Sequence, residues 1–148
     1  MTAAGAIERL CRPGVGFAFK LIRRERPGVQ DFRRLLVWEK AHALALAVRR
    51  ATHRFRRADS ALRQQAVRAA ESIPSNIVEG CYAASRKEFA RFLDISIKST
   101  GELEYHLQLA RDHGLILPDR WQSLTADATE VRRMLVGLRR RLLAHLPS

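Results

Sequence analysis

The chain has 148 residues, room for one domain of ordinary size, and it carries 27 Lys and Arg against 15 Asp and Glu. The formal net charge of +12 and the hydrophobic content of 47% indicate a basic globular protein, not a disordered one. The longest stretch without a charged side chain, residues 41–48, is far shorter than the roughly twenty residues of a transmembrane helix, which excludes a spanning segment. Two cysteines without metal-ligand spacing, and no signal-peptide pattern, lead us to expect a cytoplasmic protein with free thiols.

The first 30 residues are basic and have neither helical nor strand periodicity around their two Arg-Pro-Gly breaks at residues 12–14 and 26–28. We therefore expect a poorly ordered N-terminal arm over residues 1–30, followed by one helical domain over residues 31–148. A basic arm is suited to gripping phosphate or an acidic partner, and the alternative is an inert extension or a mis-assigned start codon.

Two helices are predicted in the first half of the domain. Apolar side chains at steps of three and four residues form one stripe along a helix of about twenty residues, and they are Trp38, Ala41, Ala45, Val48, Thr52 and Phe55. Asp59 or Ser60 offers an N-cap for the second helix, and Gly80 suits the left-handed position at its C-terminal end. The apolar stripe of this second helix comprises Leu62, Ala66, Ala69, Ile73 and Ile77.

Two longer helices are predicted in the second half. The string Ser-Arg-Lys-Glu at residues 85–88 has the capping-box form directly before apolar residues, and the helical pattern then continues to Gly114. Pro118 restarts the chain, and a nearly unbroken stripe runs to the C-terminus through Trp121, Leu124, Ala128, Val131, Leu135, Leu138 and Leu142. No sustained period-two run and no hairpin turn is present. The pattern predicts an all-α fold, an up-down-up-down antiparallel four-helix bundle.

Pro74 interrupts the second predicted helix. Proline lacks a backbone donor and clashes with the preceding turn, so we predict a kink or a local break near residues 71–74. Small and polar residues occupy helical spacings around it and interrupt the apolar third helix, and they are Ser72, Ser75, Asn76, Glu79, Ser96 and Ser99.

These polar residues have three readings. They satisfy the carbonyl that Pro74 frees and each other, they pack at a contact between helices or subunits, or they form a site for an anion or a partner. Because they stand where a monomeric bundle would use bulk, we predict a closed homo-oligomer that packs through the second and third helices.

The string Ser-Ile-Pro-Ser-Asn-Ile-Val-Glu-Gly at residues 72–80 is distinctive, and further motifs accompany it at residues 31–35, 37–41, 85–93 and 101–104. In this order they resemble the bacterial four-helix bundle family of 23S ribosomal RNA intervening-sequence proteins, over about residues 31–143. The resemblance implies the bundle fold and a homo-pentamer, and it supplies no catalytic residues. A related branch, the accessory protein of diversity-generating retroelements, forms a basic pentameric barrel that binds a reverse transcriptase and nucleic acid.

The domain is basic even without the arm, and its arginines cluster. Since a positive field favours polyanions and Arg suits bidentate phosphate contacts, the predicted nucleic-acid contacts are Arg49, Arg50, Arg54, Arg56, Arg57, Arg132, Arg133, Arg139, Arg140 and Arg141. The alternative is that these arginines are the solvated faces of bundle helices. Because no aromatic residue interleaves the arginine clusters of the last helix, the expected mode is sequence-independent phosphate contact without base stacking.

No pattern of catalytic or metal-binding residues accompanies these features. Glu102 and Glu104 are two residues apart on a helix and cannot act as a facing pair, although Glu102 could approach Arg63 or Arg68 across the bundle. The histidines lack the spacing of a helical metal site. We therefore predict a non-enzymatic protein without a cofactor that binds itself and RNA or DNA, and no membrane. The alternative is an adaptor for a protein partner such as a reverse transcriptase or a ribosomal component.

Overall fold

Four long helices carry most of the residues that the structure, a computed structural model, describes, which are 31–144. They are α3 (Leu36–Thr52), α4 (Ser60–Cys81), α5 (Arg86–Asp112) and α6 (Pro118–Leu143). Short 3-10 helices, η3 (Phe32–Arg34) and η4 (Arg57–Asp59), precede α3 and α4. No strand occurs between residues 31 and 144, and the predicted all-α bundle is confirmed. The N-terminal arm predicted at residues 1–30 lies outside the described residues.

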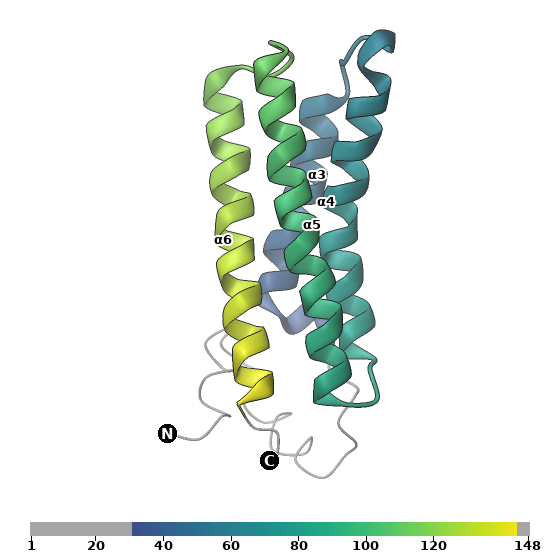
Figure 1. Ribbon diagram of the computed structural model, residues 1–148, viewed down its shortest axis with the longest axis vertical. Coiled ribbons are helices and arrows are strands. Elements are labelled where there is room, and N and C mark those ends of the chain that lie inside the picture. The colour runs from purple at the N-terminus through teal and green to yellow at the C-terminus, as the bar shows by residue number, and fades with distance from the viewer. Residues whose placement is uncertain (1–30, 145–148) are drawn as a thin grey trace.

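Each helix packs on the next one along the chain, and α3 also packs on α6, which closes the bundle. Figure 1 shows the chain reversing its direction at each connection, so that the start of α3 and the end of α6 lie at the same end of the bundle. The α3–α6 register is marked at the surface by Lys40, whose Nζ lies 3.0 Å from Glu130 Oε1.

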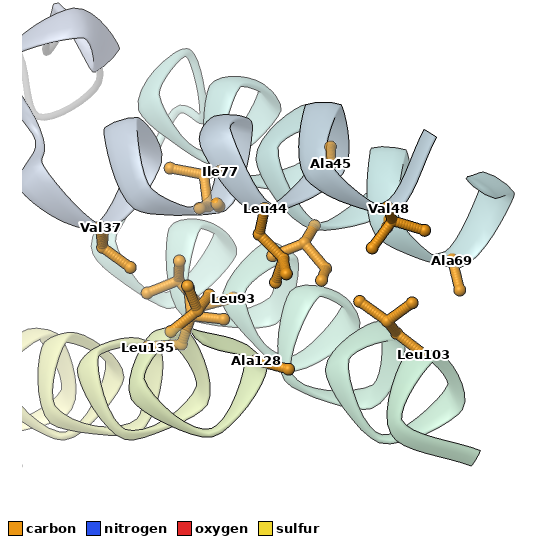
Figure 2. Close-up of a cluster of buried hydrophobic side chains, with 14 of the residues drawn as sticks. Val37, Leu44, Ala45, Val48, Ala69, Ile77, Leu93, Leu103, Ala128 and Leu135 are labelled. Atoms are coloured by element: carbon orange, nitrogen blue, oxygen red, sulfur yellow. The ribbon is translucent and has the colours of Figure 1, made fainter. Parts of the chain in front are cut away.

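The predicted apolar stripes form the core. In the last helix Leu124, Ala128, Val131, Leu135 and Leu138 are buried, while the first and last members of that stripe pack partly buried against the cluster. Figure 2 shows side chains from all four helices converging on this cluster. The spacing of three and four residues therefore identifies the buried face of the first, second and fourth helices, because that spacing keeps side chains on one side.

The first helix ends earlier than predicted, at Thr52. Thr52 is buried, and its hydroxyl donates to the Val48 carbonyl over 2.9 Å. The Phe55 N–H donates to the Thr52 carbonyl, so Phe55 lies in the following turn and packs partly buried against the core from there. The stripe predicts a helix one turn too long because a residue in the following turn can reach the same core face as the helix before it.

The helix α4 is unbroken across Pro74, so the local break near residues 71–74 is wrong, while the kink remains a prediction. Asp59 stands at the N-cap position, but its side chain makes no capping hydrogen bond there. Its carboxylate instead accepts from Arg56 Nε at 3.1 Å. The predicted cap is therefore replaced by a contact within the preceding turn.

Gly80 does not occupy the left-handed position predicted for it. It lies inside α4, and the one glycine with a positive φ in residues 31–144 is Gly114, at 68°. A Cβ added at Gly80 would lie 2.3 Å from Cδ2 of Phe89 on α5. The glycine is thus needed for the close approach of α5, while Gly114 ends α5 with the Leu115 N–H donating to the Ala110 carbonyl at 2.8 Å.

The capping box predicted at the start of α5 is present with one change. Ser85 accepts from the Glu88 N–H at 3.1 Å, as the motif requires. Glu88 Oε2 accepts in return from the N–H of Ala84, at 2.8 Å, one residue before the cap. The box therefore fixes both the first turn of α5 and the loop that enters it.

Candidate nucleic-acid interface

The ten predicted contact arginines form two groups at opposite ends of the bundle. Arg49 and Arg50 lie in the last turn of α3, and the next three follow in the connection to α4. The other five lie on the second half of α6. Since α6 runs from the end where α3 stops to the end where α3 begins, the two groups are separated along the bundle axis (Figure 1). They do not form one patch on a single protomer.

The first group contains two arginine doublets seven residues apart, and the first member of each is held by a carboxylate. Arg49 donates from Nε and Nη2 to one oxygen of Glu71 on α4, with Nε at 3.1 Å. Arg56 Nε donates to Asp59 at 3.1 Å. These two arginines fix the end of α3 to α4 and the turn that joins them.

The second group repeats this arrangement on α6. Arg132 Nη2 lies 3.4 Å from Glu104 Oε1 on α5, and Thr129 also contacts that oxygen, at 3.5 Å. Arg139 Nε lies 2.5 Å from Asp94 Oδ1, an ion pair without the geometry of a hydrogen bond. Both pairs join α6 to α5 at the rim of their contact.

The second arginine of every doublet is exposed and has no ion pair or side-chain hydrogen bond within residues 31–144. These arginines are Arg50, Arg57, Arg133 and Arg140, and Arg54 is in the same state. Arg141 is half-buried at the end of α6. Of the ten predicted contacts, four stabilise the bundle, five have guanidinium groups without a partner from the described part of the chain, and Arg141 belongs to neither group.

Gly137 lies on α6 between two of these exposed arginines. It is four residues after Arg133 and three before Arg140, so the three share one face of the helix. Within residues 31–144, a Cβ added at Gly137 would have no atom within 4 Å outside the adjoining helical turns. Gly137 is not among the residues predicted from the sequence, and the signal that could have identified it is an internal helical glycine flanked by arginines at helical spacing.

The polar residues around Pro74 are mostly engaged within the contact between α4 and α5. Ser72 Oγ and Ser99 Oγ are 2.9 Å apart, Asn76 Nδ2 donates to the Ser72 carbonyl at 2.8 Å, and Ser96 Oγ donates to the Ile73 carbonyl at 3.0 Å. Ser96, Ser99 and Pro74 are buried, whereas Ser75 and Glu79 are exposed on α4.

These hydrogen bonds do not go to the carbonyl that Pro74 deprives of a donor. That carbonyl belongs to Ala70, four residues earlier, whereas the polar side chains bond to the carbonyls of Ser72 and Ile73. These polar side chains therefore join α4 to α5, and their hydrogen bonds do not satisfy the carbonyl that Pro74 leaves without a donor.

Glu102 does not pair with Arg63 or Arg68. Its Oε1 lies 3.5 Å from Nε2 of His106, one turn later on the same helix. The sequence could not show this, because the side of α5 on which Glu102 stands depends on how the helix is rotated in the bundle. Glu104, two residues away, lies on the side that faces α6.

Cys81 is a buried free thiol at the end of α4. Burial raises the pKa of the Cys81 thiol to about 12, with a smaller contribution from the charge of Asp31. Between residues 31 and 144, no three His, Cys, Asp or Glu side chains gather closely enough to bind a metal ion. In the same part of the chain, no helix has the length and apolar character to cross a membrane.

Comparison with known proteins identifies a family and a similar solved structure. The family model described as 23S rRNA-intervening sequence protein matches residues 33–137. A crystal structure at 1.70 Å, of a protein with unknown function from the S23 ribosomal protein family of Bacteroides thetaiotaomicron, is similar with a TM-score of 0.67. It is 26% identical, and the match covers 71% of this chain and 96% of that chain. No curated protein matches.

Proposed function

Since the chain belongs to the family of 23S rRNA-intervening sequence proteins, we propose that it is a non-enzymatic, homo-oligomeric basic bundle that binds the phosphate backbone of nucleic acid in the cytoplasm. The observation that carries the proposal is the set of exposed arginines left over when the internal ion pairs are made. Four carboxylates near the arginine doublets pair with the first members of the doublets, and Glu130, three residues before Arg133, pairs with Lys40. The second members add positive charge that nothing in the described chain neutralises, and a phosphate backbone complements that charge.

Assembly into an oligomer, a pentamer by the family resemblance, is supported by the outer surface of α5. Ile95 is 44% exposed and Tyr105 is 62% exposed. Apolar side chains of this size gain free energy when they are covered, and the exposed Ser75 and Glu79 lie on the neighbouring helix. A second copy of the chain would cover them and place further arginines around the same ligand.

Binding and assembly are tested together in solution. Light scattering on the purified full chain is expected to give one closed oligomer, and a monodisperse monomer at micromolar concentration would contradict assembly. Fluorescence anisotropy with RNA and DNA probes of one sequence is expected to show affinity that falls steeply between 50 and 200 mM salt. The slope of log affinity against log salt is about −0.9 per phosphate neutralised on B-DNA, so it counts the contacts.

A matched chain without residues 1–30 separates the contribution of the arm from that of the bundle. Retention of most of the slope in the shortened chain is expected if the arginines of the bundle carry the binding. Absence of salt-dependent binding by the full chain at 50 mM salt would refute the proposed function.

An adaptor for a protein partner is the second candidate, and a different observation favours it. Large apolar side chains are exposed away from the outer face of α5, and they are Leu46, Tyr82, Leu117 and Val136. Such side chains suit contact with another protein, of which a reverse transcriptase or a ribosomal component is the class that the family resemblance suggests. An oligomer that assembles normally but binds no nucleic acid would put this function first.

A further inference from the structure

In each of the two arginine doublets of α6, one arginine pairs with a carboxylate of α5 and the other is exposed to solvent. Arg132 and Arg139 point to carboxylates of α5, and Arg133 and Arg140 are exposed with Gly137 between them. We propose that Arg133, Gly137 and Arg140, here called the α6 ledge, are the surface on which the phosphate backbone of a nucleic-acid duplex lies. This inference rests on the proposed function and assigns it to one face of one helix.

The ledge is rigid and regularly spaced. Its two arginines are seven residues apart on an uninterrupted helix, which places their Cα atoms on one face about 10.5 Å apart along the axis. The ion pairs of Arg132 and Arg139 hold this part of α6 against α5. Two guanidinium groups on such a support reach separate phosphates without prior ordering of a loop. At the other end of the bundle, Arg57 lies in η4 and has no such helical support.

The glycine at the centre of the ledge is not required by close packing within residues 31–144. A glycine within a helix destabilises it relative to alanine, and such a glycine usually permits a close approach. At Gly137, no atom of residues 31–144 beyond the adjoining helical turns lies within 4 Å of an added Cβ. The absence of a Cβ instead lets an external group come close to the helix backbone between the two arginines, and charge complementarity identifies that group as a phosphodiester.

The ledge favours a duplex over a single strand. Proteins that bind single strands stack bases on aromatic side chains along a basic groove. The one aromatic residue of α6 is Trp121, which is half-buried, has the Arg111 guanidinium 4.2 Å from its ring centre, and lies at the opposite end of the helix. DNA and RNA duplexes share the phosphodiester chemistry that the ledge would contact, so separate probes must distinguish them.

Three double variants with the same change of charge test the ledge in the full-length protein. R133Q/R140Q is expected to keep the fold and the oligomer while the salt slope on a 30-base-pair DNA duplex falls by up to about 1.8 per protomer in contact, which corresponds to two lost phosphate contacts. R132Q/R139Q removes the same charge from neighbouring positions, and it is expected to lower thermal stability while it leaves the slope unchanged. R50Q/R57Q removes the same charge from the other end, and it is expected to lower the slope less than R133Q/R140Q does, because Arg57 lies in the short η4 helix.

The outcomes separate the ledge from the proposed function. Equal losses of slope in R133Q/R140Q and R132Q/R139Q, or a loss in R50Q/R57Q alone, would overturn the ledge and leave nucleic-acid binding standing. A parent protein that binds no probe would overturn both. Equal binding of the matching single strand, with the same loss in R133Q/R140Q, would overturn the preference for a duplex. A matching RNA duplex, run alongside, shows which nucleic acid is preferred.

Substitution of Gly137 gives an independent test, because stability and affinity for a duplex are expected to change in opposite directions. Gly137→Ala is expected to raise the melting temperature, since the added methyl group meets open space and the helix gains a better helix former. The same variant is expected to bind duplex several-fold more weakly, because the methyl group holds the backbone away. A more stable variant with unchanged affinity would refute the close approach at Gly137.

Discussion

The helix α5 is held on its two sides by different means. On the side of α4, Phe89 packs where Gly80 has no side chain, and buried Ser96 donates to a carbonyl of the opposite helix. On the side of α6, the rim of the contact is made by the partly exposed pairs of Arg132 and Arg139. Buried shape and directed hydrogen bonds fix a helix register strongly, whereas exposed ion pairs add little free energy. Beside the contact between α5 and α6, however, the unpaired Arg133 and Arg140 leave positive charge at the surface, where a ligand can bind.

The contact between α4 and α5 is expected to exclude water and reagents. The reactivity of the Cys81 thiol, at the end of α4, measures this exclusion. Because burial raises the pKa of this thiol from 9.0 to about 12, its thiolate fraction at pH 8 falls about a thousandfold, a factor of ten for each pH unit. Labelling with a thiol reagent is expected to be suppressed by at least that factor and restored in denaturant. Cys11 lies outside the described residues, so a Cys11→Ser chain is the one to label. Rapid labelling of Cys81 in the folded chain would contradict close packing here.

The same thiol gives a pH dependence with a defined sign. Its pKa is higher in the folded state, so the unfolded chain loses the proton first as the pH rises. The contribution of Cys81 to stability is therefore fully present below pH 9 and is lost as the pH rises towards 12. A Cys81→Ala variant is expected to show a smaller loss of stability between pH 9 and 11 than its parent, as measured by chemical denaturation.

Gly80→Ala is expected to destabilise the contact between α4 and α5. The new methyl group would meet the ring of Phe89, and overpacking of this kind costs about 1–3 kcal/mol in the free energy of unfolding. Gly101→Ala is the matched control, because Gly101 also lies inside a helix but has open space around its Cβ position. The control is expected to gain roughly 0.5–1 kcal/mol. Urea denaturation measures the free energy of unfolding of both variants. Similar changes in this free energy would contradict the packing role of Gly80.

Ser96→Ala is expected to destabilise the fold by about 1 kcal/mol, because it removes a buried hydrogen bond between α4 and α5. Ser75→Ala is the control on the exposed face of α4 and is expected to change the free energy of unfolding by less than about 0.5 kcal/mol. A Ser96 variant as stable as its control would show that the two helices are held by apolar packing alone.

The smallest effect is expected on the α6 side. Arg132→Gln and Arg139→Gln each break a partly exposed ion pair, worth at most about 1 kcal/mol and less at high salt. Thermal denaturation at 50 and 500 mM salt is expected to show the difference between variant and parent shrinking with added salt. A difference that does not depend on salt would mean that these arginines act through packing of their aliphatic parts.

Local spacing accounts for the part of the fold that the sequence predicted. Leu135 and Leu138 could be placed in the core because both stand on one stripe, and Ser85 could be placed at a cap because its partner Glu88 is three residues away. The sequence predicts a left-handed position for Gly80, which is wrong. The glycine is needed because the ring of Phe89, on another helix, occupies the space of its Cβ. A glycine that makes room and a glycine that turns the chain are alike in a sequence.

The positions of the arginines in the candidate interface could be predicted from the sequence. Which arginine of each doublet is paired with a carboxylate could not. Neighbouring arginines such as Arg132 and Arg133 have the same chemistry, and which of them is paired depends on the register of a carboxylate 28 residues earlier in the chain. The repeat of seven residues between doublets is visible in the sequence, and it indicates that equivalent members share a face. It does not indicate which face is turned towards another helix.

The contact between α3 and α6 bears on how the chain folds. All other large helix contacts in the described residues join helices that are consecutive along the chain, and this one joins the first to the last. Hairpins of consecutive helices close short loops quickly, whereas α3 can dock on α6 only after the intervening chain is arranged. Folding kinetics should therefore show the α3–α6 seam, marked by Lys40 and Glu130, as the latest to form, with substitutions there changing the unfolding rate more than the folding rate.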